Sequence, residues 1–319
     1  MATFKKIKIQ LDDGLIADAV APEIVSASRR TDIPAFYADW LMERLRKGYC
    51  DWRNPFNLQI QHVSFSRTKF IVFWTKNPKP LMRYLREIYD MGIRFYFQHT
   101  VNNYEKERME PNLLPFEERC ATFRQIAEEW GAGRQVWRWD PIFLIDGELT
   151  IDDLVGRIVS TLSWLDDFPR KLVISFADIA AYRKVQYNLR HTSVREMTVD
   201  EQRQFADKLM GRLSNRGIKV ATCGERIDLS EFGIQHNACI DPELISAFAT
   251  NDDDFAERVL KMGKDSGQRD CCLCTVAKDI GSYNTCAHGC KYCYANVTPE
   301  MARENFEKIS RNGHKSILL

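Results

Sequence analysis

The sequence predicts an α/β fold in which helices surround a parallel sheet, arranged as a TIM-like (β/α) barrel or a partial barrel. Short apolar segments alternate with helix-like stretches six or seven times along the chain, which is typical of a parallel sheet with external helices. Most of these segments turn polar at their ends, as buried parallel strands do. The chain has 319 residues and 45% hydrophobic residues, enough for one large domain or two smaller ones.

The expected elements follow in chain order. Strands are predicted at 23–30, 70–78, 94–102, 134–141, 171–178, 218–225 and, more weakly, 237–242. The clearest helices are predicted at 35–48, 80–92, 116–131 and 150–165. Gly48 and Gly131 are expected C-caps, and Thr150 with Asp153 resembles a capping box. Residues 6–11 and 15–20 alternate around a turn at 12–14, which predicts an N-terminal hairpin.

Two regions differ in composition. Residues 1–250 hold the predicted barrel together with the hairpin at 1–22. Residues 251–319 begin with a short helix and a polar linker, continue into a cysteine-rich segment and contain a helix at 298–309. We expect this second region to pack on the barrel.

Charge and hydropathy exclude some classes of protein. The formal net charge is +1, which gives no reason to expect nucleic acid or an anionic membrane as partner, although a local basic patch is still allowed. The first residues lack an apolar segment of signal-peptide length, and no run approaches a membrane span. We therefore expect a cytoplasmic protein without membrane partners.

Polar side chains gather where the predicted strands end. Because the working residues of (β/α) barrels lie at the carboxyl ends of the strands, these positions are candidate site residues, although strand ends also meet water in any protein. They are Ser28, Arg29, Arg30, Asp32, Thr75, Lys76, Asn77, Gln98, His99, Asn102, Arg138, Asp140, Ser175, Asp178, Cys223, Glu225 and Arg226.

Six of the ten cysteines fall between residues 271 and 293. In a reducing compartment such a cluster indicates metal binding or catalysis more than disulfides. Cys286, Cys290 and Cys293 have the spacing C-x3-C-x2-C. A zinc site is one interpretation, since Cys290 with Cys293 and Cys272 with Cys274 form two close pairs.

A 4Fe–4S cluster is the other interpretation. Three thiolates on one loop leave one iron open to the amino and carboxylate groups of S-adenosylmethionine, and the reduced cluster then cleaves the sulfonium to give a carbon radical. Tyr292 is placed to pack over the adenine or the cluster, and Gly289 allows a tight turn. The role of Cys272 and Cys274 remains open: they are ligands of a second metal, the source of a fourth cluster ligand, an electron relay or zinc ligands. Cys271 is interpreted as an incidental neighbour.

The segment TCAHGCKYCYAN at 285–296 resembles the signature of the radical S-adenosylmethionine superfamily, C-x3-C-x-aromatic-C, and most closely its spore photoproduct lyase-like (DNA repair photolyase-like) branch. SRRTDIPAFY, FWTKNP and RWDPIFLIDG are similar to three further segments of that branch. They occur in the branch's order, but the cysteine loop comes last here instead of first. This order is what a circular permutation gives, and a barrel permits it because its chain ends can lie close together.

Over residues 22 to about 296 the chain resembles the bacterial and archaeal domain-of-unknown-function family eighteen-forty-eight. The likeness is carried by SASRRTDIPAFY, FWTKNP, RWDPI, CIDP and KDIGSYNTCAHGCKYCYAN.

The superfamily resemblance implies cofactor roles. Lys76 stands where that branch has a lysine near the S-adenosylmethionine carboxylate, and a solvent-exposed lysine is the alternative. Glu225 in CGER is similar to the acidic residue that meets the cofactor amino group, although the familiar motif has two glycines and lies soon after the cysteine loop. Tyr292, Arg138 and Ser175 complete the expected cofactor contacts, with a structural ion pair between Arg138 and Asp140 as the alternative.

Candidate catalytic residues are less specific. Arg29, Arg30 and Asp32 lie on the first βα loop, where they face either a substrate or a helix-flanking ion network. Asp140 is grouped with them. His99 is a candidate general acid or base, or a structural histidine.

Two functional classes follow. The first is a radical S-adenosylmethionine enzyme that acts on a small molecule or nucleic acid and takes electrons from a flavodoxin or ferredoxin. The second is a non-catalytic metal protein that holds zinc or an electron-transfer cluster on the same scaffold. The ring of polar strand ends favours the enzyme, since an electron carrier does not need it.

Overall fold

The main sheet of the protein contains eight strands. The structure, a computed structural model, describes residues 4–250, 252–311 and 315–318. The strand order is β13-β12-β10-β8-β7-β6-β3-β14, and each neighbouring pair is parallel. The predicted parallel α/β fold is confirmed. The strands are β3 (Ile24–Ala27), β6 (Phe70–Thr75), β7 (Arg94–Thr100), β8 (Gln135–Ile142), β10 (Lys171–Phe176), β12 (Lys219–Thr222), β13 (Gln235–His236) and β14 (Lys278–Asp279).

The sheet is open, so a barrel, the finer part of the predicted barrel or partial barrel, is not found in the described part of the chain. β13 and β14 are its two edges, and within the described ranges no pairing joins them. Each of these edge strands has two residues, too few to complete the ladder that closure requires. The chain between them, residues 237–277, instead crosses one face of the sheet, which we call the inner face. The contacts of Cys239 and Ile240 described below show this crossing.

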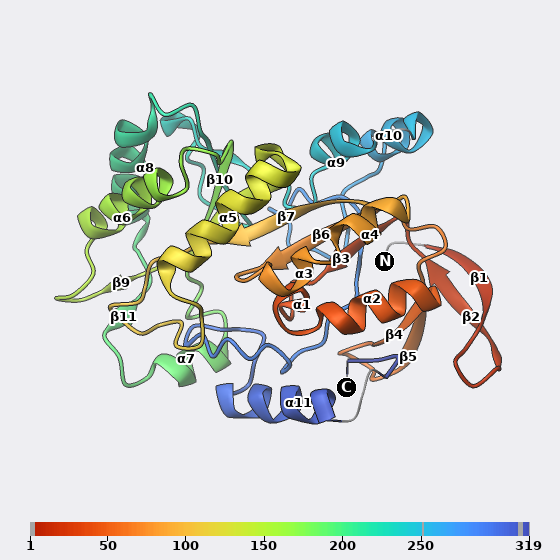
Figure 1. The fold of residues 1–319 in the computed structure, drawn as a ribbon. Helices are drawn as coiled ribbons and strands as arrows, with labels where there is room; N and C mark the ends of the chain where they lie inside the picture. Colours follow the sequence, from red (N-terminus) through yellow and green to blue (C-terminus); the bar gives the residue numbers. More distant parts are fainter. Residues whose placement is uncertain (1–3, 251, 312–314, 319) are drawn as a thin grey trace.

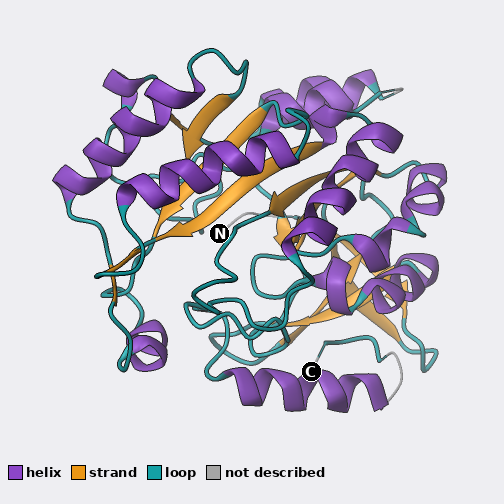
Figure 2. Ribbon diagram, turned by 60° about the vertical axis from the view of Figure 1, so that its left-hand side comes forward, coloured by secondary structure: helices purple, strands orange, loops and turns teal. Residues whose placement is uncertain are grey.

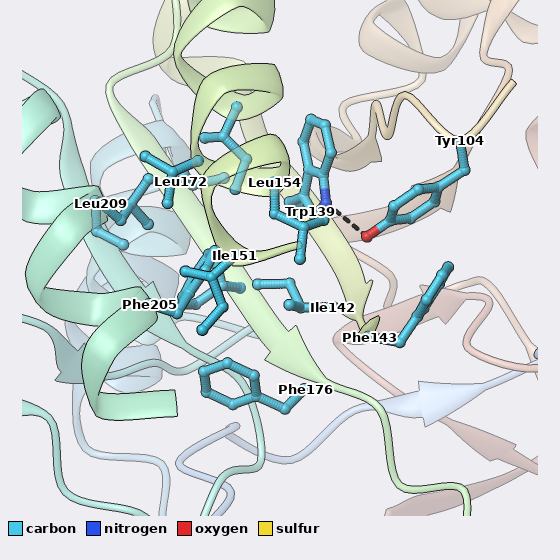
Figure 3. Close-up of a cluster of buried hydrophobic side chains, with 14 of the residues drawn as sticks. Tyr104, Trp139, Ile142, Phe143, Ile151, Leu154, Leu172, Phe176, Phe205 and Leu209 are labelled. Atoms are coloured by element: carbon cyan, nitrogen blue, oxygen red, sulfur yellow. Dashed lines mark hydrogen bonds between the residues drawn. The ribbon is translucent and has the colours of Figure 1, made fainter. Parts of the chain in front are cut away.

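Most helices cover the other face of the sheet (Figure 1). Alternation along the strands directs Phe73, Phe97, Trp137 and Ile174 toward these helices. Figure 3 shows part of the resulting core, in which the Trp139 indole donates to the Tyr104 hydroxyl at 2.8 Å. The helices on this face are α1 (Ile33–Phe36), α2 (Ala38–Lys47), α3 (Lys79–Met82), α4 (Leu85–Asp90), α5 (Phe116–Trp130), α6 (Ile151–Trp164) and α8 (Val199–Leu213), and α7 (Arg183–Leu189) lies apart from it, at the lower left of Figure 1.

The inner face is covered by the C-terminal part of the chain. Helices α9 (Pro242–Phe248) and α10 (Asp253–Leu260) pack on Val72, Tyr96, Val136 and Val173. Because side chains alternate along a strand, residues two positions further toward the carboxyl end share this face. They are Trp74, Gln98, Arg138 and Ser175.

A second sheet lies beside the first (Figure 2). Its order is β1-β2-β5-β4. The predicted N-terminal hairpin is confirmed as β1 (Lys5–Gln10) and β2 (Ile16–Ala21). β4 (Tyr49–Arg53) and β5 (Ile60–Ser64) were not predicted. The smaller elements are β9 (Leu144–Ile145), β11 (Val194–Arg195) and the 3-10 turns η1 (Ala132–Arg134) and η2 (Ser230–Phe232). The helix predicted at 298–309 is present as α11 (Pro299–Arg311).

Some predicted boundaries change. The helix expected at 80–92 is divided into α3 and α4, and the strand expected at 237–242 is replaced by β13, just before it. The capping box of Thr150 and Asp153 is present. The region after residue 250 contributes β14 to the main sheet. None of the helices in the described ranges has the length and apolar character needed to span a bilayer.

Candidate functional site

The cysteine loop begins directly after β14, at the carboxyl edge of the sheet. Asp279, the last residue of β14, accepts hydrogen bonds from the Ser28 hydroxyl at 2.8 Å, the Ser26 hydroxyl at 3.1 Å and the Arg29 backbone N–H at 3.0 Å. The next turn passes so close to β3 that a Cβ on Gly281 would lie 2.0 Å from the Ser28 hydroxyl oxygen. The Asp279 carboxylate therefore holds the loop against the end of β3, and Gly281 permits the close approach because it has no side chain.

Backbone N–H groups point at two of the three loop thiols. The Cys286 sulfur accepts from the N–H groups of His288 and Asp32, and the Cys293 sulfur accepts from those of Ala295 and Asn296. Burial raises the pKa of Cys286 to about 12, with smaller contributions from Asp32 and Cys293. The thiol therefore stays protonated until a metal replaces the proton.

The turn between Cys286 and Cys290 requires Gly289. Its φ is +71°, and a Cβ there would lie 2.9 Å from the Asn112 amide nitrogen. Asn112 holds this turn in place, since its side chain donates to the Ala287 carbonyl at 2.9 Å and its backbone N–H to the His288 carbonyl at 3.2 Å.

Asp32 connects three segments at the carboxyl ends of β3 and β6. One of its carboxylate oxygens caps α1 through the Ala35 N–H at 3.0 Å. The other accepts the Lys76 backbone N–H at 2.7 Å and lies 2.8 Å from His288 Nε2. Asp32 thus holds the cysteine loop against two strand ends, which fits the helix-flanking network considered for it in the sequence.

Lys76 lies beside Cys290 in a buried charged cluster. Its ammonium contacts Glu110 Oε1 at 2.7 Å and the Tyr292 hydroxyl at 3.1 Å, and the Tyr292 hydroxyl also donates to Glu110. Burial works against the charge of Lys76, but Glu110 and then Cys290 raise its pKa. The Tyr292 ring packs on Phe143, with 5.8 Å between centroids. Tyr292 therefore anchors the loop, and Lys76 places a positive charge next to Cys290.

Arg29 and Arg30 point in different directions. The Arg29 guanidinium lies over the Trp74 ring, 5.0 Å from its centroid. Arg30 lies 3.7 Å from Asp279 and covers Tyr283. The Arg29 carbonyl accepts the Tyr294 hydroxyl at 3.0 Å.

A second group of thiols lies on the inner face, beside Arg138. Arg138 donates to Asp140 at 2.7 Å and to the Cys239 sulfur at 3.0 Å. The Cys239 thiol in turn donates to the Cys223 sulfur at 3.0 Å. Cys274 hydrogen-bonds both Cys239 and Cys272. The sequence suggested a metal role for Cys272 and Cys274 alone, and the fold brings two distant cysteines to them. Cys271 turns away and donates to the Gly224 carbonyl at 3.1 Å.

Glu225 and Ser175 lie together at the ends of β12 and β10. Glu225 accepts the Ser175 hydroxyl at 3.0 Å and the Phe176 N–H at 2.9 Å. Burial raises the pKa of Glu225 to about 7, more than these two hydrogen bonds lower it. A cationic amino group that arrived here would favour the ionised carboxylate.

His99 lies on the opposite face of β7 from Gln98. Its ring stacks on Phe123 of α5, with 5.1 Å between centroids, and its Nδ1 lies 2.8 Å from Gln135 Oε1. Burial lowers the pKa of His99 to about 4. This is a core position among the covering helices, so we do not group His99 with the site.

Among the residues that build the site and that sequence reasoning missed are Asp279, His288, Glu110 and Tyr294. Three of them lie within or just before the cysteine motif, so their position next to it was an available signal. Glu110 lies on an irregular loop with no motif. In the described part of the chain, no group of three or more His, Cys, Asp or Glu side chains is already set around one point for a metal ion. A bound metal would therefore require thiol groups to turn.

Comparison with known proteins identifies the family. The sequence model of the family DUF1848, a domain of unknown function, matches residues 24–295. The chain therefore belongs to that family. No curated protein and no solved structure matches the chain.

Proposed function

We propose that this protein is a radical S-adenosylmethionine enzyme whose 4Fe–4S cluster is held by Cys286, Cys290 and Cys293. One observation carries the proposal. The three thiols follow β14 at the carboxyl edge of a parallel sheet, and backbone N–H groups already point at two of their sulfurs. Hydrogen bonds to the sulfurs are one of the means by which proteins stabilise and tune iron–sulfur clusters.

The strand order supports the circular permutation inferred from the motifs. When β14 is counted first, the spatial order β14, β3, β6, β7, β8, β10, β12, β13 follows the chain without a break. The cysteine loop then comes after the first strand, as in the superfamily that the motif resembles. This order is consistent with our proposal that the sheet derives from a partial (β/α) barrel whose start was relocated.

The residues around the loop fit a 4Fe–4S cluster, which is negatively charged and here has one iron without a protein ligand. Such a cluster supplies one electron to the sulfonium of S-adenosylmethionine and so generates a carbon radical. Lys76 offsets the charge of the Cys290 thiolate, and Glu110 fixes the ammonium in that position. Because Lys76 is already paired, we assign it to the cluster more than to the cofactor carboxylate.

The cofactor itself would lie between the loop and the ends of β8, β10 and β12. Glu225 and Ser175 are the candidates to accept its amino group, since the Glu225 carboxylate has no cationic partner among its hydrogen bonds in the described ranges. Asp140 is the candidate for the ribose hydroxyls, since Arg138 orients its carboxylate. Arg30, which lies over Tyr283, and the exposed Tyr294 ring are the candidates to meet substrate.

The cellular setting follows from this chemistry. Because an oxygen-sensitive cluster needs a reducing compartment and an electron donor, we propose a cytoplasmic enzyme that is reduced by a flavodoxin or a ferredoxin. The substrate class, small molecule or nucleic acid, stays open at this level.

The test is made on protein purified without oxygen and reconstituted with iron and sulfide. The reduced protein is examined by electron paramagnetic resonance before and after addition of S-adenosylmethionine, and 5′-deoxyadenosine is measured. We expect a 4Fe–4S signal that changes on addition, together with 5′-deoxyadenosine. Cys290→Ser should lose the signal, whereas Cys120→Ser, a buried cysteine of α5 far from the loop in the chain, should keep it.

Two results would oppose the proposal. A stable cluster that does not respond to S-adenosylmethionine would assign the loop to electron transfer or to a structural role. Zinc bound by these three cysteines, with no cluster after reconstitution, would exclude the enzyme.

A further inference from the structure

The second group of thiols does not belong to the cysteine loop. We propose that Cys223, Cys239, Cys272 and Cys274 bind one Zn²⁺ ion in a tetrathiolate site, separate from the Cys286 loop. The four sulfurs form a connected series: Cys223 with Cys239 at 3.0 Å, Cys239 with Cys274, and Cys274 with Cys272. In the sequence they span 52 residues, from 223 to 274, so only the fold brings them together.

The backbone holds three of these cysteines firmly. Cys223 continues β12, and its N–H donates to the Ile174 carbonyl at 2.9 Å. The Cys239 carbonyl accepts both the Tyr96 hydroxyl at 2.6 Å and the Gln98 amide at 2.7 Å. The Cys274 carbonyl accepts the Asp265 N–H at 2.9 Å.

The sulfurs sit among donors, as metal-bound thiolates do. The Ile240 N–H donates to the Cys274 sulfur at 3.3 Å, the Asn237 amide to the Cys239 sulfur at 3.3 Å, and Arg138 to the Cys239 sulfur at 3.0 Å. Such outer contacts orient metal ligands and stabilise their charge. Thiols that filled an apolar core would have no use for three N–H donors.

The surrounding charge fits a tetrathiolate zinc site. Zn²⁺ with four thiolates carries a net charge of about −2. Arg29 and Arg138 both lie over the Trp74 ring, 5.0 and 5.1 Å from its centroid, and both face the thiol group. Arg138 is buried, and the Arg29 Nη2 atom is buried without a hydrogen-bond partner. Arg138 is already paired with Asp140 at 2.7 Å, whereas the Arg29 Nη2 atom has no hydrogen-bond partner among the described residues. Negative charge on the neighbouring thiolates would therefore balance Arg29 above all.

The spacing of the sulfurs favours one ion over an iron–sulfur cluster. Zn–S bonds of about 2.3 Å in a tetrahedron set the sulfurs about 3.8 Å apart. The Cys223 and Cys239 sulfurs are 3.0 Å apart, so modest rotation of the side chains would open the series around one ion. A 4Fe–4S cluster places its own irons and sulfides between the thiolates and would require a much larger separation.

The test measures metal content in the full-length protein. Cells are grown with zinc and iron, and zinc and iron per chain are determined by mass spectrometry. We compare the unchanged protein with Cys272→Ser, Cys239→Ser, the matched control Cys120→Ser, and the triple variant Cys286→Ser/Cys290→Ser/Cys293→Ser. Cys272 is half-buried on a loop, so its substitution threatens folding least.

We expect about one zinc per chain in the unchanged protein, in Cys120→Ser and in the triple variant. Zinc should fall about tenfold or more in Cys272→Ser and Cys239→Ser, because a structural zinc site needs all four ligands. Cobalt added to zinc-free protein should give the absorption of tetrahedral thiolate coordination, and Cys272→Ser should lose it.

Three results would overturn the inference. The first is iron with sulfide, instead of zinc, in the triple variant. The second is zinc that survives Cys272→Ser and disappears from the triple variant. The third is metal-free protein with a disulfide between Cys223 and Cys239. Because the triple variant lacks the proposed cluster ligands, its zinc content tests this site whatever the outcome for the radical chemistry.

Discussion

Replacing His99 with phenylalanine should reduce the dependence of stability on pH. Burial lowers the pKa of His99 from 6.5 to about 4. The unfolded chain therefore binds a proton at a pH where the folded protein does not, so the stability present above about pH 6.5 is lost as pH falls toward 4. The full pKa shift corresponds to a change of about 3 kcal/mol in the free energy of unfolding. Between about pH 7.5 and pH 5 the change is about 2 kcal/mol.

The variant isolates this effect from the loss of a contact. Phenylalanine keeps the stack on Phe123 but leaves Gln135 Oε1 without its 2.8 Å partner, which costs about 1–3 kcal/mol at every pH. At about pH 7.5 the variant should therefore be less stable than the unchanged protein by that amount. At about pH 5 the difference should shrink by about 2 kcal/mol, because the variant has no histidine to protonate.

The assay is urea unfolding of both proteins, followed by far-ultraviolet circular dichroism at several pH values. Phe123→Leu is the matched control, because it weakens the same stack and keeps His99, so its penalty should not shrink in this way at low pH. Parallel pH profiles for His99→Phe and the unchanged protein would refute the reasoning and return His99 to the candidate acids and bases.

Two further predictions concern the cysteine loop. Gly281→Ala places a Cβ against the Ser28 hydroxyl and should lower the iron content of the reconstituted protein. The control Gly263→Ala has open space at its Cβ and should keep the iron content of the unchanged protein. Equal iron content in the two variants would contradict the close approach. Lys76→Met leaves the Glu110 carboxylate buried and unpaired and should cost about 3–5 kcal/mol in urea unfolding, and adding Glu110→Gln should recover most of it; a double variant no more stable than the single one would show that the two charges are not coupled.

The sheet was predictable because its signals are local. A short apolar run predicts a buried parallel strand. Such a run is present in β3, β6, β7, β8, β10 and β12. β4 and β5 escaped prediction because their five residues each show neither a continuous apolar run nor a regular alternation. They belong to the second sheet, where β5 pairs with β2 and β4 pairs with β5. Closure of the barrel could not be decided from local patterns, since it depends on whether β13 and β14 meet.

The site was predictable only where its residues share a motif. Spacing alone selected Cys286, Cys290 and Cys293, and the strand end selected Lys76. Glu110 could not be found in this way, because it reaches Lys76 from an irregular loop 34 residues further along the chain.

The open sheet and the second thiol group explain each other. Because β13 and β14 are opposite edges of the sheet, the chain that joins them has to cross one face. It crosses the inner face, where the Cys239 carbonyl accepts from Tyr96 and Gln98, and the crossing segment carries Cys239, Cys272 and Cys274. Cys223 directly follows β12, so a metal bound by all four would fasten this crossing to the sheet. The same segment then leads into β14 and Asp279, which hold the cysteine loop against β3. Loss of zinc should therefore weaken iron binding at the loop, whereas loss of the loop thiols should leave zinc unaffected.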